Sequence, residues 1–256
     1  MGAESVLRKG MHHMKLRIKF NKYGPIRFIG HLDVMRFFQK AIRRAGIDIA
    51  YTGGYSPHQI MSFAAPLSVG LESNGEYMDI EVNSMISCED IKDRLNKASV
   101  PGIKILSVKI LPEGAGNAMA SVAAASYTVS FRQGREPKLD IASTLPDFLS
   151  KEHIIITKET KKGTREVDLK PGIFELRWQK NSFFMLLDAS SGGNIKPGQI
   201  IEAFLSEYGE ALQENALLIT REDTFTNLGT QEERQLVPLD AIGLSALPEG
   251  GEAYES

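Results

Sequence analysis

The chain has little cysteine, with Cys88 alone among its 256 residues. One cysteine cannot form an internal disulfide, and it cannot supply a CxxC pair or a CxxxCxxC cluster. We therefore expect a protein of the reducing cytoplasm that holds no cofactor of its own. Long apolar runs are also missing, because none approaches the roughly 18 residues that a membrane helix needs, and the start of the chain lacks a signal-peptide core. Because of these absences, we expect neither a membrane span nor export.

Acidic residues are scarce in the first part of the chain. Residues 1–64 contain 11 Lys and Arg against 3 Asp and Glu, a net charge of +8, so the remaining 192 residues carry −10 to give the total of −2. Clustered basic side chains raise the local anion concentration and displace counterions from a phosphate backbone. The near-neutral total therefore hides a basic part that favours a polyanion such as RNA, with a solvated basic surface as the alternative.

Apolar periodicity predicts two tandem ferredoxin-like (split βαβ) domains of the α+β class, with antiparallel sheets. The first order is strand, helix, strand, strand, helix, strand, from the segments 15–20, 32–45, 47–51, 63–71 with 77–82, 87–98 and 103–111. The second repeats it with 127–132, 139–151, 154–158, 174–188, 197–208 and 216–220. We expect a flexible extension at 1–13, domains at 14–112 and 125–228, a linker at 113–124, and an acidic disordered tail at 229–256.

The helix over residues 32–45 has a polar stripe opposite its apolar face. Asp33, Arg36, Lys40 and Arg43 follow one another at spacings of three, four and three, so they project from one side. Tyrosines on the following loop offer stacking surfaces for unpaired bases. The expected nucleic-acid contacts are Arg17, Lys19, Arg27, Arg36, Lys40, Arg43, Arg44, Tyr51 and Tyr55. Ordinary helix-dipole compensation and core packing of the tyrosines are the alternative roles.

Two histidines lie on loops that neighbour this helix. His31 precedes it, and His58 ends a stretch marked by glycine and proline, GGYSPH. Imidazole gains and loses protons near neutral pH, so two such side chains can accept and donate the protons that move during metal-free RNA cleavage. With Asp33 the same pair offers a weak metal-ligand set. His31, His58 and Asp33 are therefore the candidate catalytic residues, while ordinary hydrogen-bonded loop histidines are the alternative.

A second candidate site precedes the helix that we expect over residues 197–208. The residues Gly192, Gly193, Asn194 and Lys196 lead into it, and exposed amides at a helix N-terminus bind phosphate or sulfate. The spacing is not that of a Walker loop, and a plain strand-to-helix turn is the alternative. The basic turn at 161–165 is expected to be a solvated hairpin tip.

The segments RFIGHLDVMRFFQKAIRRAGI, GGYSPHQIMSFAAPLSVGLES and SSGGNIKPGQI together resemble a bacterial family called radical-SAM-linked proteins, a domain of unknown function. The resemblance spans residues 15–220. The positions that carry it most clearly are Arg27, Gly30, His31, Asp33, Arg43, Arg44, Gly54, Tyr55, Pro57 and His58. It implies an accessory role to a separate, cobalamin-binding radical S-adenosylmethionine (SAM) enzyme acting on RNA or ribosomal components. Radical chemistry itself is not expected, because the cluster-binding cysteines are missing.

These observations favour an RNA-binding or substrate-presenting accessory protein without catalytic activity of its own, whose partners are RNA and a radical SAM enzyme. A metal-independent ribonuclease that uses His31 and His58 is one alternative, supported by analogy of fold only. A protein-binding adaptor without nucleic-acid contact is the other, because a basic surface also suits an acidic protein.

Overall fold

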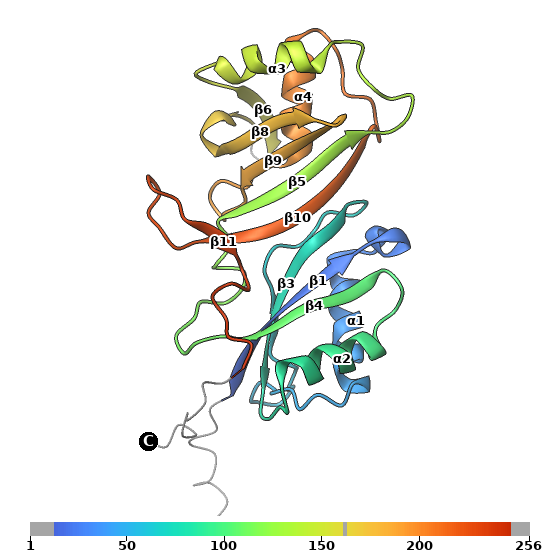
Figure 1. The fold of residues 1–256 in the computed structure, drawn as a ribbon, viewed down its shortest axis with the longest axis vertical. Helices are drawn as coiled ribbons and strands as arrows, with labels where there is room; N and C mark the ends of the chain where they lie inside the picture. The colour runs from blue at the N-terminus through green and yellow to red at the C-terminus, as the bar shows by residue number, and fades with distance from the viewer. Residues whose placement is uncertain (1–12, 161–162, 247–256) are drawn as a thin grey trace, which may run out of the picture. The chain divides into compact units, whose positions relative to one another are not determined.

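The structure is a computed structural model that describes residues 13–160 and 163–246. These residues form a mixed α+β protein with four α-helices and a mostly antiparallel set of strands, which confirms the α+β part of the prediction (Figure 1). The described residues divide into two compact units, the first made of 13–70, 75–121 and 237–246 and the second of 71–74, 122–160 and 163–236. Each unit has its own hydrophobic cluster.

The first unit is a sheet covered on one face by two helices. Its strands run in the order β4-β1-β3, with β2 paired to β3. In chain order the elements are β1 (Met14–Lys22), the 3-10 helix η1 (Gly24–Phe28), α1 (His31–Arg44), β2 (Met61–Phe63), β3 (Glu72–Val82), α2 (Cys88–Ala98) and β4 (Ile103–Ile110). β1 and β4 are antiparallel, as are β2 and β3.

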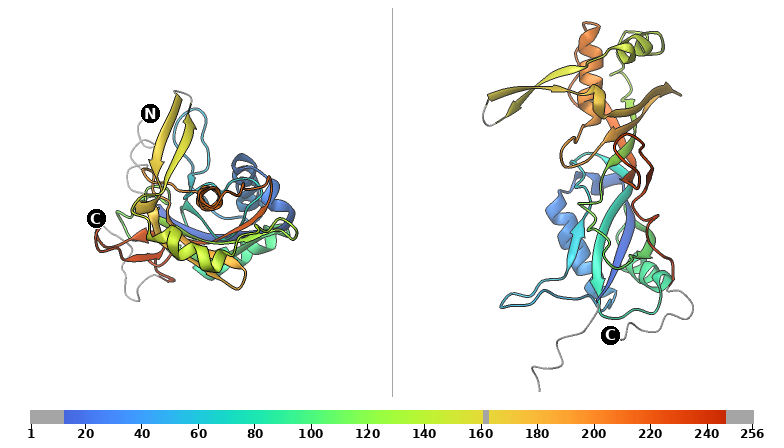
Figure 2. Two further views of the ribbon diagram at one scale, coloured as in Figure 1. Left: turned by 90° about the horizontal axis from the view of Figure 1, so that it is seen from above. Right: turned by 90° about the vertical axis from the view of Figure 1, so that its left-hand side faces the viewer.

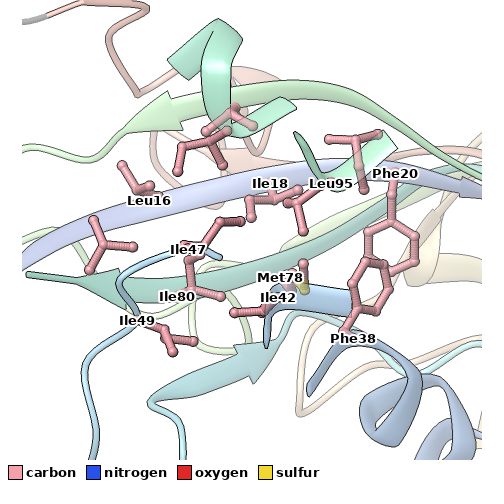
Figure 3. Close-up of a cluster of buried hydrophobic side chains, with 14 of the residues drawn as sticks. Leu16, Ile18, Phe20, Phe38, Ile42, Ile47, Ile49, Met78, Ile80 and Leu95 are labelled. Carbon is pink, nitrogen blue, oxygen red and sulfur yellow. The ribbon is translucent and has the colours of Figure 1, made fainter. Parts of the chain in front are cut away.

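Alternation along β1 explains this layering. Leu16, Ile18 and Phe20 point to the helices and join Phe38 and Ile42 of α1 in the buried cluster (Figure 3). Phe20 and Phe38 meet edge to face with ring centroids 4.7 Å apart, an arrangement that adds to simple burial. The core therefore fixes which side of α1 faces inward, and the polar stripe predicted for this helix remains outside.

Local signals set the ends of the helices. α1 ends where Gly46 adopts a left-handed φ of +62°, a backbone conformation that favours glycine. The hydroxyl of Ser87 accepts a hydrogen bond from the Asp90 amide and caps α2. Gly102 has a φ of +95°, and a Cβ there would lie 2.6 Å from the Tyr23 carbonyl oxygen, so only glycine fits this turn.

The second unit repeats the arrangement with one added hairpin. Its main strands run in the order β10-β5-β9-β8. The elements are β5 (Ala124–Phe131), α3 (Ile141–Ser150), β6 (Ile155–Thr160), β7 (Gly163–Asp168), the 3-10 helix η2 (Lys170–Gly172), β8 (Ile173–Gln179), β9 (Ser182–Asp188), α4 (Pro197–Glu207), β10 (Leu217–Asn227) and β11 (Leu236–Pro238). Glu72 and Ser73 pair in parallel with Thr220 and Arg221 of β10.

Several predicted strands differ from the observed ones. Residues 47–51 form only isolated bridges, at Ile49 and Tyr51. Of the strand expected at 63–71, only Phe63 belongs to β2, because Pro66 lies within the run and cannot donate to a ladder. Residues 154–158 do not join the main sheet. They form the separate β6–β7 hairpin, which projects from the second unit in yellow (Figure 2).

The C-terminal residues differ from the disordered tail that their acidity predicts. β11 pairs with β10, and Leu239 is fully buried in the first unit. Ile110 and Leu244 exchange backbone hydrogen bonds. The segment expected as a linker is also partly fixed, since Ala118 is fully buried. Residues 1–12, the Lys161–Lys162 part of the basic turn and residues 247–256 lie outside the described residues, so the expectations for them stay predictions.

Candidate functional site

The basic stripe of α1 lies on the surface of the first unit. Arg36, Lys40 and Arg43 are all exposed, opposite the buried Phe38 and Ile42. Arg36 forms an ion pair of 3.3 Å with Asp33, and both side chains are more than three-fifths exposed. An exposed pair of this kind contributes little stability and is easily exchanged for another anion. The stripe therefore presents three accessible cations along about two turns of helix.

The predicted tyrosine loop extends from the same unit between residues 50 and 60. Ile60 donates its amide to the Ala50 carbonyl and Thr52 donates to the His58 carbonyl, so the loop closes like a short hairpin. Its tip contains Tyr55, whose side chain is fully exposed. Figure 2 shows this loop extending away from the sheet of the first unit. A large aromatic ring held in solvent has no packing role within the unit, and its flat face is open for stacking.

The loop and the basic stripe meet at the carbonyl oxygen of Gln39 in α1. The Gln59 side-chain amide, from the base of the loop, donates to this oxygen at 3.3 Å and lies 3.5 Å from the Tyr51 hydroxyl. The Arg43 guanidinium donates to the same oxygen at 3.3 Å. Side chains separated in sequence are therefore neighbours in space. We call Arg36, Lys40, Arg43, Tyr51 and Tyr55 the helix–loop surface.

Gln59 holds this junction together. Its side chain is 6% exposed, and its Oε1 has no hydrogen-bond partner among the described residues. A buried acceptor without a partner costs free energy, so such a group calls for an explanation such as a ligand donor or an ordered water. Sequence reasoning missed both Gln39 and Gln59, because a glutamine in a polar loop or on a helix carries no signal of its own.

Arg17 does not belong to the surface on which the sequence places it. Its guanidinium is completely buried and forms two hydrogen bonds, of 2.8 and 2.9 Å, with the Asp79 carboxylate. It also donates to the carbonyls of Gly116 and Leu239. The alternation along β1 places Arg17 on the face away from the helices, and the segments around residues 116 and 239 cover that face. The prediction that Arg17 contacts nucleic acid is therefore wrong.

Three other predicted cations are only partly available. Lys19 is half-buried, and its ammonium lies 5.4 Å from the centre of the Tyr77 ring. Arg27 is half-buried and lies over the Phe28 ring. Arg44 is exposed, but it donates to the Ala98 carbonyl at 2.8 Å at the end of α2. Each has a structural contact that a phosphate would have to share or replace.

The two candidate histidines have different surroundings. His31 lines a small pocket with Lys22, Glu76 and the edge of Phe63, whose ring centroid lies 5.1 Å away. The pocket has room for about one water molecule. His58 is exposed, and its Nδ1 lies 3.1 Å from the Thr52 hydroxyl. His58 is not among the residues that line the His31 pocket, so no contact in the structure supports a shared proton-transfer site.

Metal ligation also finds no support. Within residues 13–160 and 163–246, no three His, Cys, Asp or Glu side chains converge as ligands. Asp33 pairs with Arg36 rather than with a histidine.

No helix in the described residues is long and apolar enough to cross a membrane.

Several amides of the loop before α4 donate hydrogen bonds to acceptors in the same segment of the chain. The Asp188 carboxylate accepts from the Ser190 amide, the Ser190 carbonyl accepts from Gly193 and Asn194, and the Lys196 amide donates to the Gln199 side chain. A Cβ on Gly193 would lie 2.2 Å from an Asp188 carboxylate oxygen. A carboxylate so close repels an anion. The structure therefore favours the strand-to-helix turn over an anion site at Gly192, Gly193, Asn194 and Lys196.

The first unit thus has an exposed basic and aromatic surface on an α+β scaffold, a combination typical of nucleic-acid-binding domains. Residues 15–197 match the family described as an uncharacterized protein conserved in bacteria (DUF2344), and the chain belongs to this family. No curated protein matches the chain.

Proposed function

We propose that the protein is an RNA-binding accessory module that presents single-stranded RNA to a separate radical SAM enzyme. The observation that carries the RNA part is the junction at Gln39, where Gln59 links the tyrosine loop to the basic stripe. Arg36, Lys40 and Arg43 bind backbone phosphates, while Tyr51 and Tyr55 stack on unpaired bases. The enzyme catalyses the reaction, and this chain binds the RNA substrate.

The expected interaction free energies favour the binding of single-stranded RNA to a surface of this type. Stacking of one base on an aromatic side chain contributes about 1–3 kcal/mol, and Tyr51 and Tyr55 offer two such faces. Each phosphate contact adds counterion release, which lowers affinity as salt rises.

The fold supports a finer classification that we include in the proposal. In the first unit the strands in chain order are β1, β2, β3 and β4, and their order in the sheet is 4-1-3-2. In the second unit β5, β8, β9 and β10 follow the same order once the β6–β7 hairpin is set aside as an insertion. Two helices cross between strands in each unit. We assign both units to the ferredoxin-like class on this basis.

The partner is inferred from sequence resemblance. The segments around RFIGHLD and YSPH resemble radical-SAM-linked proteins, whose relatives occur beside such enzymes. With a single cysteine, this chain lacks the thiolate ligands that hold a radical SAM cluster. A division of labour between an RNA-binding chain and a cluster-bearing chain fits both features.

The test measures binding of small cellular RNA to the purified full chain across several salt concentrations. The Arg36→Ala, Lys40→Ala, Arg43→Ala triple variant is expected to weaken binding and to reduce the slope of log affinity against log salt by about two, because each lost phosphate contact removes about 0.7 from that slope. The matched control replaces Lys97, Lys104 and Lys138, which are exposed outside the helix–loop surface, and is expected to keep the wild-type slope.

Other outcomes select the alternatives. RNA recovered with 2′,3′-cyclic phosphate ends, lost in His31→Ala, would favour the ribonuclease. Salt-sensitive binding to an acidic protein with no RNA capture would favour the adaptor. Equal RNA binding by the triple variant and wild type would remove the helix–loop surface from the proposal.

A further inference from the structure

A groove in the second unit lies between the β6 strand and helix α4. It has a volume of about 560 Å³ and is lined along one wall by Ile155, Ile156, Thr157 and Lys158 of β6. The opposite wall is the outer side of α4, with Gln199, Glu202, Ala203 and Ser206. The groove belongs entirely to the second unit and is separate from the helix–loop surface.

The β6 strand is hydrogen-bonded along one edge only. The β6–β7 sheet has two strands, so each strand has a free edge. The Leu169 amide donates to the Ile154 carbonyl, which makes these two residues a hydrogen-bonded pair. Alternation in the antiparallel register then assigns Ile156 with Val167 and Lys158 with Arg165 to further hydrogen-bonded pairs. The amides and carbonyls of Ile155 and Thr157 consequently point away from β7.

This free edge lines the groove. Ile155 and Thr157 are exposed, and both line the cavity that α4 closes on the other side. A row of alternating N–H and C=O groups is complementary to an extended polypeptide backbone. RNA offers phosphate and base edges, which do not reproduce that alternation. Backbone chemistry therefore selects a peptide as the occupant.

The charges of the hairpin indicate which type of residue the bound peptide has at one position. Lys158 and Arg165 lie directly opposite each other on one face of the hairpin, and the described residues provide no ion-pair partner for either. Like charges in opposite positions destabilise a ladder. Of the other charges that line the groove, Lys151 pairs with Glu207 and His153 with Asp168, whereas Glu202 on the α4 wall has no ion-pair partner among the described residues. An acidic residue placed opposite Lys158 would relieve the repulsion.

The neighbouring pair, Ile156 and Val167, indicates the type of residue at a second position of the peptide. Ile156 and Val167 are opposite each other and lie on the same face as Lys158 and Arg165. An added antiparallel strand places one residue opposite Lys158 and, two positions later, another opposite Ile156. The pattern that fits is an acidic residue, any residue, and then a β-branched apolar residue, since such residues form favourable cross-strand pairs.

We propose that the groove between β6 and α4 binds an extended segment of a partner protein by strand addition, with an acidic residue opposite Lys158 and an apolar one opposite Ile156. The inference is independent of RNA binding. It gives the chain a second contact surface, made of different residues on a different unit, through which a protein partner is held.

The experiment pans a displayed library of random peptides of about nine residues on the full chain. Enriched peptides are expected to share the acidic–x–apolar pattern. Thr157→Pro removes an amide that faces the groove and no hydrogen bond to β7, so binding of the enriched peptides should fall by about tenfold or more. Glu166→Pro is the matched control, because it removes an outward amide from the other edge of the hairpin and should leave binding unchanged.

Two further measurements keep the test decisive if the proline variant disturbs the hairpin. Hydrogen exchange of the wild-type chain should show slower exchange at Ile155 and Thr157 when an enriched peptide is present. Lys158→Glu should shift the library toward basic residues at the acidic position. An unenriched library, or enriched peptides that bind Thr157→Pro and Lys158→Glu as they bind wild type, would overturn the proposal.

Discussion

The guanidinium of Arg17 and the carboxylate of Asp79 form a buried, two-pronged ion pair in the sheet of the first unit. The carbonyls of Leu239 and Gly116 accept further guanidinium hydrogens, so the charge is compensated on several sides. The desolvation penalty of burying such a pair offsets much of its electrostatic attraction. Removing one partner is strongly destabilising, because the remaining charge stays buried without compensation. Arg17 therefore acts as a structural cation that ties strand β1 to segments distant in the sequence.

Replacing Asp79 by Ala should lower the free energy of unfolding by about 3–5 kcal/mol, because an uncompensated guanidinium stays buried. The double variant Arg17→Met, Asp79→Leu should lose less than the single variant, since no buried charge is left. Denaturant unfolding of the variants measures both values. A single variant as stable as wild type would show that the pair contributes nothing to the fold.

The β6–β7 hairpin is anchored at its base by Asp168. Its carboxylate accepts hydrogen bonds from the amides of Ile154 and Lys170 and lies 2.8 Å from His153 Nδ1. The hydrogen bond to the His153 side chain, followed by those to the two amides, lowers the pKa of Asp168 below its ordinary value. The groove proposed for a peptide depends on this anchor, because Ile154 leads directly into β6.

The lowered pKa of Asp168 fixes the direction of a pH effect on the hairpin. A carboxylate whose pKa is depressed in the folded state stabilises that state above the pKa of the unfolded chain, about 3.9, and the contribution is lost as pH falls through the lower folded pKa. Hydrogen exchange of the β6 and β7 amides should therefore accelerate, relative to the rest of the unit, in acid.

In the Asp168→Asn variant the hairpin amides should exchange faster than in wild type already at neutral pH. Residue 168 should then add no further acceleration in acid, because asparagine does not titrate. Glu159→Gln is the matched control, because Glu159 lies in the same strand and its side chain has no hydrogen-bond or ion-pair partner among the described residues. An Asp168→Asn hairpin that exchanges like wild type at neutral pH would assign the anchoring to other contacts.

At the scale of the whole molecule, the chain returns from the second unit to complete the first. Leu239 is fully buried there, and the Asp240 carboxylate accepts hydrogen bonds from Tyr77 and Ser107. Leu244 pairs with Ile110 at the end of β4. The first unit is thus built from both ends of the described chain, and its stability depends on residues that follow the entire second unit.

A chain that ends at Leu236 should have a destabilised first unit, by several kcal/mol for the loss of Leu239 burial and of an Arg17 acceptor. Cys88 reports this directly, because it is the only cysteine, is 4% exposed, and burial raises the pKa of its thiol. Thiol labelling should accelerate in the shortened chain, since only the thiolate of an opened unit reacts.

A chain that ends at Ala246 keeps all of these contacts and is the control for that truncation. Equal labelling rates for Cys88 in the two shortened chains would mean that the returning segment is dispensable for the first unit.

Elements that depend on local residue patterns could be predicted from the sequence. The alternation of β1, the apolar face and glycine stop of α1, and the Ser87 cap of α2 can be read from neighbouring residues, and the structure agrees with each. The exposure of Arg36, Lys40 and Arg43 was also predictable, because a helix with one apolar face must present the other.

Tertiary structure alone decided what covers each surface and which distant residues meet. Alternation assigned Arg17 to a face of β1, but only the returning 239 segment and the 116 segment bury that face. No pattern in the sequence predicts that Gln59 joins the loop to Arg43 through Gln39, or that β6 leaves the main sheet with one free edge. Periodicity follows from a residue's neighbours in the chain, whereas burial and strand pairing follow from contacts that closing the fold creates.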